Sequence, residues 1–283
     1  ATITADAPGL ESDAVSITIT DYGHAGVPSL SPDYSADVET DWWANHPFNP
    51  ESPDYNPNIL SPNPQISAAD YDNDLTVALN ALPDSGGTIL LEDGATYTVP
   101  DTGILIAGRS HLHFVSQGHS IIKAPSSFSG IPRPNGGTSD VMITIQSRPG
   151  DWHDDNYANN AALADPAQDI YFKNITFDAN NAAATSLNLW ATSDVIFDNC
   201  EFFGATGNQE LHTGAWCNNI WARNCRFAGT ANHALVWDGT HGSGILNCEF
   251  EHNLSGSTNI VFLSNDDCSR DVINDGDNYA TWQ

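Results

Sequence analysis

Basic residues are scarce in this sequence. Only 8 of the 283 residues are lysine or arginine, against 36 aspartates and glutamates, so the formal net charge is −28. A surface with this charge repels nucleic-acid phosphates, which excludes nucleic acid as a partner. The mutual repulsion of so many carboxylates favours a saline environment that screens them, or bound cations such as Ca²⁺.

Long apolar runs are missing as well. No stretch reaches the roughly 18 apolar residues that a membrane-spanning helix needs, so we expect no membrane insertion. The chain begins at Ala1 without a basic leader, and we therefore expect a processed, extracellular or cell-surface protein. Hydrophobic residues still make up 40% of the sequence, which is typical of a chain with a substantial core.

The first 67 residues lack the patterns of a core domain. Residues 1–20 alternate apolar and polar side chains around a Pro-Gly turn, which predicts a β-hairpin and resembles the end of a bacterial immunoglobulin-like module. Residues 21–67 are rich in proline and asparagine and predict an extended arm. Trp42 and Trp43 either anchor this arm on the main domain, 68–283, or form a platform for sugar stacking.

One helix is predicted, at about 72–82. Asp72 or Asn73 can cap it, Leu75 and Leu79 lie on one face, and Pro83 ends it. The segment 85–97 follows, with a Gly-Gly-Thr strand and a Gly-Ala-Thr-Tyr turn. Together these features resemble the start of the pectin-lyase-like superfamily. The resemblance implies a right-handed parallel β-helix whose open end is covered by the helix.

A repeat within about 168–268 supports this all-β fold. Asparagines fall at 174, 199, 224 and 247, and each is followed by an apolar-x-Phe triplet. Asparagine tolerates the positive φ of a sharp turn between two strands of a coil. The residues after it then stack in columns, listed as Ile175, Cys200, Cys225 and Cys248, and as Phe177, Phe202, Phe227 and Phe250.

Four of the five cysteines fall in the repeat region. Five cysteines leave at least one thiol unpaired, and Cys200, Cys225 and Cys248 all occupy the same position of the repeat. Small apolar side chains that fill a tight column are one interpretation. A disulfide between neighbouring coils is the other.

The third strand of each coil carries polar residues where alternation points them outward. Leu187, Leu211 and Leu235 form an inward column. Proteins of the resembled superfamily place their sites on the opposite, outer face of that strand and on its flanking loops. We therefore select as catalytic candidates Glu210, His212, His233 and Asp238, and as substrate-binding candidates Asn188, Trp190 and His241. The alternative is that these are ordinary solvated side chains.

Part of this pattern resembles polygalacturonase-type glycoside hydrolases. Glu210 matches the first acid of their Asp-Asp element, and His233 matches the histidine of their Gly-His-Gly element. Leu211 stands where the second acid is expected, no acid occurs at 184–186, and no Arg-x-Lys lies near 259–263.

Two acidic clusters are candidate Ca²⁺ sites, since calcium prefers carboxylate oxygens. One comprises Asp151, Asp154 and Asp155 in a short polar loop, and the other is Asp266-Asp267.

The sequence thus predicts a secreted β-helix protein that acts on an extracellular polysaccharide as a hydrolase or lyase. Carboxylates on neighbouring coils suit glycosidic hydrolysis, and Ca²⁺ with a base suits β-elimination. The alternatives are a glycan-binding or adhesin module without catalysis, and a structural surface protein that self-associates end to end through stacked coils.

Overall fold

The computed structural model describes residues 64–133, 136–147, 167–207, 209–214, 217–229, 231–238, 240–241, 243–246, 248–252 and 258–263. The predicted hairpin at 1–20 and nearly all of the arm at 21–67 lie outside these residues. None of the helices in this part of the chain is long and apolar enough to cross a membrane.

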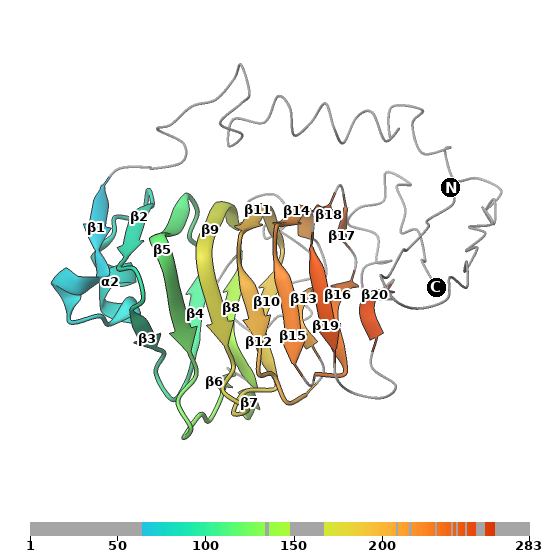
Figure 1. The fold of residues 1–283 in the computed structure, drawn as a ribbon. Coiled ribbons are helices and arrows are strands. Elements are labelled where there is room, and N and C mark those ends of the chain that lie inside the picture. The colour runs from blue at the N-terminus through green and yellow to red at the C-terminus, as the bar shows by residue number, and fades with distance from the viewer. Residues whose placement is uncertain are drawn as a thin grey trace, which may run out of the picture.

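Two long parallel sheets make up most of the described chain (Figure 1). The strands of sheet A are β1 (Gln65–Ser67), β2 (Gly87–Leu91), β3 (Thr96–Thr98), β5 (Leu112–Lys123), β9 (Ala167–Asp178), β11 (Thr192–Asp198), β12 (Glu201–Phe203), β14 (Cys217–Arg223), β15 (Arg226–Gly229), β17 (Thr240–His241), β18 (Gly244–Leu246) and β19 (Glu249–His252). The strands of sheet B are β4 (Ile104–Ala107), β8 (Val141–Gln146), β10 (Thr185–Trp190), β13 (Gln209–Thr213), β16 (His233–Asp238) and β20 (Thr258–Leu263). A short antiparallel pair, β6 (Ile131–Pro132) and β7 (Thr138–Ser139), stands apart from them.

The order of the strands shows how the chain winds. The main path of sheet A is β1-β2-β5-β9-β11-β14-β17, and sheet B runs β20-β16-β13-β10-β8-β4. The chain therefore adds a strand to sheet A, crosses to sheet B, and returns to sheet A beside its previous strand. This is a parallel β-helix, and crossovers of this kind between parallel strands are almost always right-handed. The fold class predicted from the sequence is confirmed.

A short helix covers the N-terminal end of the coils (Figure 1). The 3₁₀ helix η1 (Ala68–Tyr71) leads into α2 (Leu75–Ala81), whose Leu75 and Leu79 are buried in the core. The N-cap is Asp74, whose carboxylate accepts hydrogen bonds from the backbone N–H groups of Thr76 and Val77 at 2.8 and 3.0 Å. The prediction of Asp72 or Asn73 as the cap is wrong, because both residues have a positive φ, at 54° and 60°.

Arg109 ties this helix to the first coil. Its guanidinium donates hydrogen bonds to the carbonyl oxygens of Leu79, Leu82 and Pro83, at 2.6, 3.0 and 3.0 Å. These carbonyls lie at or just after the C-terminal end of α2, where the helix dipole favours a positive charge. The Leu79 carbonyl also accepts from the backbone N–H of Leu82 at 3.2 Å.

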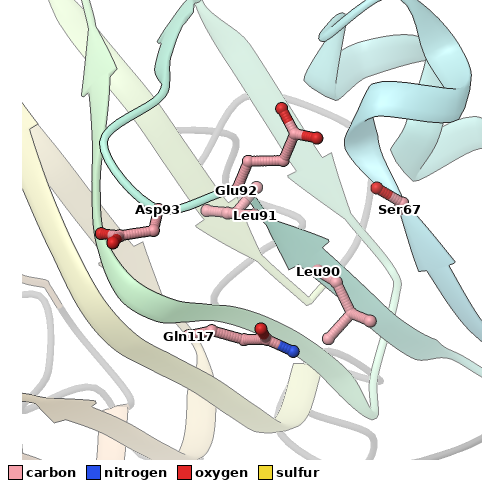
Figure 2. A pocket seen from close by; sticks show the side chains of 6 residues that line it. All are labelled: Ser67, Leu90, Leu91, Glu92, Asp93 and Gln117. Atoms are coloured by element: carbon pink, nitrogen blue, oxygen red, sulfur yellow. The ribbon is translucent and has the colours of Figure 1, made fainter.

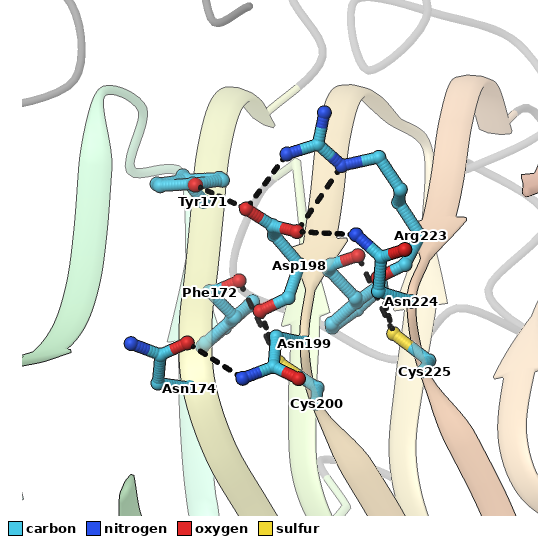
Figure 3. A network of polar contacts seen from close by, with 10 residues as sticks. Tyr171, Phe172, Asn174, Asp198, Asn199, Cys200, Arg223, Asn224 and Cys225 are labelled. Atoms are coloured by element: carbon cyan, nitrogen blue, oxygen red, sulfur yellow. Dashed lines mark hydrogen bonds and ion pairs between the residues drawn. The ribbon is translucent and has the colours of Figure 1, made fainter. Parts of the chain in front are cut away.

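Three of the four asparagines predicted to form a ladder lie in equivalent turns of sheet A, as Asn199 does between β11 and β12, and Asn247 lies outside the described residues. Asn174, Asn199 and Asn224 have φ of 58°, 54° and 53°, the left-handed region that the repeat predicts. The Asn199 amide donates to Oδ1 of Asn174 at 2.9 Å. Asn224 instead donates to Oδ1 of Asp198 at 3.4 Å, so the ladder changes partner at this coil (Figure 3).

The inward columns fill the core between the sheets. The stacked rings of Phe177, Phe202, Phe227 and Phe250 have centroids 4.8, 5.0 and 5.1 Å apart. Cys200, Cys225 and Cys248 are not joined in disulfides, and the thiol of each donates to a main-chain carbonyl of sheet A. Burial raises the pKa of the Cys225 thiol well above its ordinary value. These contacts support the interpretation of the column as small core side chains.

Candidate functional site

The outer face of sheet B brings Asn188 and His212 together. Register pairs Leu187 with Leu211 on the inner face and Asn188 with His212 on the outer face of β10 and β13. The same outer row begins with Leu105 on β4 and Thr144 on β8, and it continues with Val236 on β16. This register confirms the inward leucine column and places the two polar residues on neighbouring coils.

A hydrogen bond joins the two side chains. Nδ1 of His212 lies 2.7 Å from Oδ1 of Asn188. Asn188 is buried and the His212 side chain is partly exposed. Burial lowers the pKa of His212 to about 4, so the ring is neutral at ordinary pH. A neutral imidazole carries a lone pair on one ring nitrogen and can accept a proton there.

Trp190 supports this pair from the end of β10. Its ring meets the His212 ring edge-on, with centroids 5.7 Å apart and planes at 77°. A Cβ added to Gly214 would lie 2.5 Å from the indole, so the glycine lets β13 approach the ring closely. Trp190 is only 3% exposed. Trp190 was selected as a substrate-binding candidate, and in this placement its ring packs against protein.

The alternation of side chains along β13 predicted that Glu210 points outward like His212. Its carboxyl group instead lies apart from the Asn188–His212 pair. Its carboxyl group is 0% exposed and sits at the corner between β12 and β13. Ser186 Oγ donates to Oε2 at 2.7 Å, and the Ala205 backbone N–H donates to Oε1 at 3.1 Å. Gly229 lies against the carboxyl group of Glu210, since a Cβ added to Gly229 would be 2.8 Å from Oε1. Burial is the main cause that raises the pKa of Glu210 to about 7.

The remaining outer-face candidates are spread over two sheets. His233 is the first residue of β16. It pairs in register with Thr258 and with Gln209, which is the residue before Glu210. Asp238 ends β16, whereas His241 lies on β17 of sheet A, where it pairs with Asn218. His241 was predicted for the outer face of this strand or a loop flanking it, and it lies three residues after β16, where the chain has turned back into sheet A. The side chains of Asp238 and His241 lie outside the described residues.

The predicted calcium ligands are not described by the structure either. Asp151, Asp154, Asp155, Asp266 and Asp267 all lie outside the described residues. Within the part of the chain that is described, no three His, Cys, Asp or Glu side chains gather in a way that could hold a metal ion.

Sequence reasoning missed a polar network on the outer face of sheet A. Asp198 accepts from Tyr171 Oη at 3.0 Å and from Arg223 Nε and an Arg223 terminal nitrogen at 3.1 and 2.9 Å (Figure 3). Burial and the charge of Asp198 raise the pKa of Tyr171. Arg223 thus forms an ion pair with Asp198 on sheet A, whereas His212 lies on sheet B.

A second polar cluster lies earlier on the same sheet. The Asp169 carboxylate is 2.8 Å from His111 Nδ1 and 3.1 Å from His113 Nε2. Burial raises the pKa of Asp169, but the hydrogen bonds with His113 and His111 outweigh it, and the pKa lies below its ordinary value. His113 lies on β5, and His111 lies just before that strand with a φ of 56°. Their shared partner is 56 residues away from His113, so the contact could not be seen in the sequence.

A shallow pocket of about 190 Å³ lies near the N-terminal end of the coils (Figure 2). Its lining residues are Ser67, Leu90, Leu91, Glu92, Asp93 and Gln117. Asp93 already accepts a hydrogen bond from the His119 backbone N–H at 2.8 Å. The carboxylate packs against Gly118, where an added Cβ would lie 1.9 Å from Oδ1. These contacts give Asp93 a structural role in closing the β2–β3 turn.

Comparisons with known proteins bear on the fold. No protein-family model matches the chain, and the search of curated proteins finds no match. Among solved structures, ORF18 of Geobacillus virus E2 superposes with a TM-score of 0.51 at 16% identity, over 68% of this chain and 38% of that one. At this identity the likeness concerns the fold, and the strand order gives that fold as a parallel β-helix.

Pectin methylesterases are also among the solved structures that match. PemA from Erwinia chrysanthemi has a TM-score of 0.44 at 15% identity, over 69% of this β-helix chain and 59% of its own. The enzyme from Yersinia enterocolitica has a TM-score of 0.43 at 15% identity, over 65% and 56%. This β-helix therefore spans well under two thirds of each of these structures, and at such identities the likeness concerns the fold.

Proposed function

We propose that this β-helix is an extracellular protein that acts on a polysaccharide along the outer face of sheet B. The observation that carries the proposal is the pairing of Asn188 with a neutral His212 on neighbouring coils. Successive coils place equivalent positions about 4.8 Å apart. In this row Leu105 is exposed and His212 partly exposed, whereas Thr144, Asn188 and Val236 are buried. His212 is the group in this row that can exchange a proton with a bound sugar.

Within this function, proton abstraction fits the site better than hydrolysis by two acids. Glycosidic hydrolysis needs two carboxyl groups on either side of the bond. Glu210 was the expected acid, but it is fully buried and engaged by Ser186 and Ala205. A neutral imidazole base suits β-elimination from a uronic acid, in which the proton next to the carboxyl group is removed. Since the chain carries a net charge of −28, we expect cations such as Ca²⁺ to be needed for a uronate polymer to bind.

A panel of polysaccharides with and without Ca²⁺ tests this function. Unsaturated products absorb in the ultraviolet and report elimination, reducing ends report any cleavage, and alcohol release reports ester hydrolysis. We expect His212→Ala to lower the rate of elimination by about 10²–10⁴-fold. His119→Ala is the matched control, because His119 bonds to Thr176 on sheet A. Cleavage that survives in His212→Ala would remove His212 from the mechanism.

A glycan-binding module without catalysis is the second candidate. The burial of Glu210 favours it, because the described outer face then lacks a carboxylate pair. Isothermal titration against the same panel separates the two functions. Retained binding of one glycan, with silence in all three activity assays, would establish the module and exclude the enzyme.

The acidic composition leads to a prediction about salt. We propose a saline habitat, and we expect the melting temperature to rise steadily between low salt and molar NaCl, because the ions screen repulsion among 36 carboxylates that face only 8 basic side chains. Differential scanning calorimetry measures this rise. Millimolar CaCl₂ in low salt is the comparison. If millimolar CaCl₂ raised the melting temperature as much as molar NaCl does, specific cation sites would be indicated and general screening contradicted.

A further inference from the structure

A row of side chains on the outer face of sheet A is almost completely buried. Register aligns Thr88 of β2, His113 of β5, Tyr171 of β9, Ile196 of β11 and Trp221 of β14 on successive coils. The row alternates along each strand with residues of the core, so its side chains point outward. Its members are nevertheless between 0% and 5% exposed. We call these five residues the aromatic row.

The described neighbours cover only part of the aromatic row. The Trp221 ring lies against Gly244 of the next coil, where an added Cβ would be 2.2 Å from the ring, and His113 meets Tyr171 edge-on with ring centroids 5.5 Å apart. These contacts run from coil to coil along the sheet. The described elements in main contact with β9, β11 and β14 are strands of the same sheet. Beyond the asparagine turn, Arg226 shows what an uncovered outer position looks like, with 41% of its side chain exposed.

The N-terminal part of the chain joins the fold beside the first residue of this row. The Thr88 backbone N–H donates to the Pro64 carbonyl oxygen at 2.9 Å, and Gln65 of β1 pairs with Thr88 in register. From β2 to β14 the row extends about 19 Å at the usual spacing of neighbouring strands. About six residues of extended chain span that distance, and the arm at 21–63 is several times longer.

The arm also matches the row in its apolar chemistry. Trp42, Trp43, Phe48 and Tyr55 supply large rings that gain from burial against other apolar side chains. The prolines of the arm lack the N–H groups that would pair it as a further strand, so it suits a position across a sheet face better than one at a sheet edge.

Charge favours sheet A over sheet B as the face that the arm covers. Residues 1–63 contain aspartates and glutamates but no lysine or arginine. Lys173 of β9 and Arg223 of β14 point to the same face as the aromatic row, two positions further along their strands (Figure 3 shows Arg223). The described strands of sheet B contain no lysine or arginine. An acidic arm is therefore attracted to the outer face of sheet A.

We propose that residues 21–63 pack across the outer face of sheet A and cover the aromatic row, with Trp42 and Trp43 as their anchors. This selects one of the two roles that the sequence allowed for these tryptophans, since rings buried against Tyr171 and Trp221 do not offer a platform for sugars. The inference does not rest on the proposed function, which concerns the outer face of sheet B.

Zero-length cross-linking of the full chain tests this placement. A carbodiimide joins a lysine amine to a carboxylate in direct contact, and the sequence contains two lysines, Lys123 and Lys173. Lys123 Nζ lies 2.6 Å from Asp178, so the cross-link between them is the internal control. We expect mass spectrometry to find Lys173 joined to acidic residues within 21–63.

Three results of this experiment would overturn the proposal. One is a cross-link from Lys173 to the segment 148–166 or 264–283 in place of the arm. Another is a cross-link from Lys173 to a second molecule, detected in a mixture of isotopically labelled and unlabelled protein, which would make this face an interface between copies. The third is the Lys123–Asp178 product without any product that joins Lys173 to the arm.

Removal of the anchors provides a second readout. We expect the double variant Trp42→Ala, Trp43→Ala to raise several-fold the rate at which hydroxyl radicals oxidise Tyr171 and Trp221, with the circular dichroism of the β-helix retained because the core is untouched. Trp152→Ala, in the segment between β8 and β9, is the matched control and should leave both rates unchanged. Unchanged rates in the double variant, or a rise in Trp152→Ala alone, would show that the arm does not cover the row.

Discussion

Phe202→Ala is expected to lower the free energy of unfolding by about 3–5 kcal/mol. The Phe202 ring is fully buried and stacks on Phe177 at 4.8 Å and on Phe227 at 5.0 Å, so its removal leaves a cavity in the middle of the column. It also meets Phe197 edge-on at 5.4 Å. Because each coil rests on its neighbours, the loss affects the contacts on both sides. Urea denaturation followed by circular dichroism measures the change.

Leu105→Ala is the control for this prediction. Leu105 is 42% exposed on the outer face of sheet B, and we expect its removal to change the free energy of unfolding by no more than about 0.5 kcal/mol. A loss below about 1 kcal/mol for Phe202→Ala, similar to that of the exposed leucine, would show that the phenylalanine column does not support the coils.

Glu210 is expected to make the protein less stable as the pH rises through neutrality. Burial raises its pKa to about 7 in the folded protein, from an ordinary value of 4.5, so the folded state holds the proton more tightly than the unfolded chain. The resulting stabilisation is complete below about pH 4.5 and is lost as the pH rises through about 7. The difference in proton affinity corresponds to about 3 kcal/mol.

Glu210→Gln isolates this effect. A glutamine does not ionise, and it can still accept from the Ala205 N–H and donate to the Ser186 hydroxyl, which can rotate. Acidification also relieves repulsion among the other carboxylates, but it does so equally in both proteins. As the pH rises from 5 to 8, we expect the free energy of unfolding of the variant to increase relative to that of the wild type. A gap that is constant with pH would contradict the elevated pKa.

The repeat could be predicted because its causes are local. A positive φ at Asn174, Asn199 and Asn224 follows from the turn itself, and the apolar-x-Phe triplets follow from the alternation of a strand. Periodicity then places equivalent residues in register, so the columns needed no three-dimensional information. The cap of α2 was misassigned by two residues or fewer, because three polar residues in a row, Asp72, Asn73 and Asp74, can all cap a helix.

The site could be predicted only in part. The outward direction of Asn188 and His212 follows from alternation within β10 and β13. The same argument failed for Glu210, because it lies at the start of β13, where the turn after β12 places the Ala205 N–H within reach of its carboxylate. That His241 belongs to a strand of sheet A could not be predicted, because two-residue β17 begins directly after the turn that leaves sheet B.

By itself, therefore, the sequence determined the parallel β-helix, its register and its inward columns, because these repeat at short, regular spacing. Only the tertiary structure decided which polar side chains are accessible and how they titrate. Glu210 meets Ser186, and His212 meets Asn188, across 24 residues of chain. Burial and pKa arise from such contacts between coils, and a pattern along one strand does not contain them.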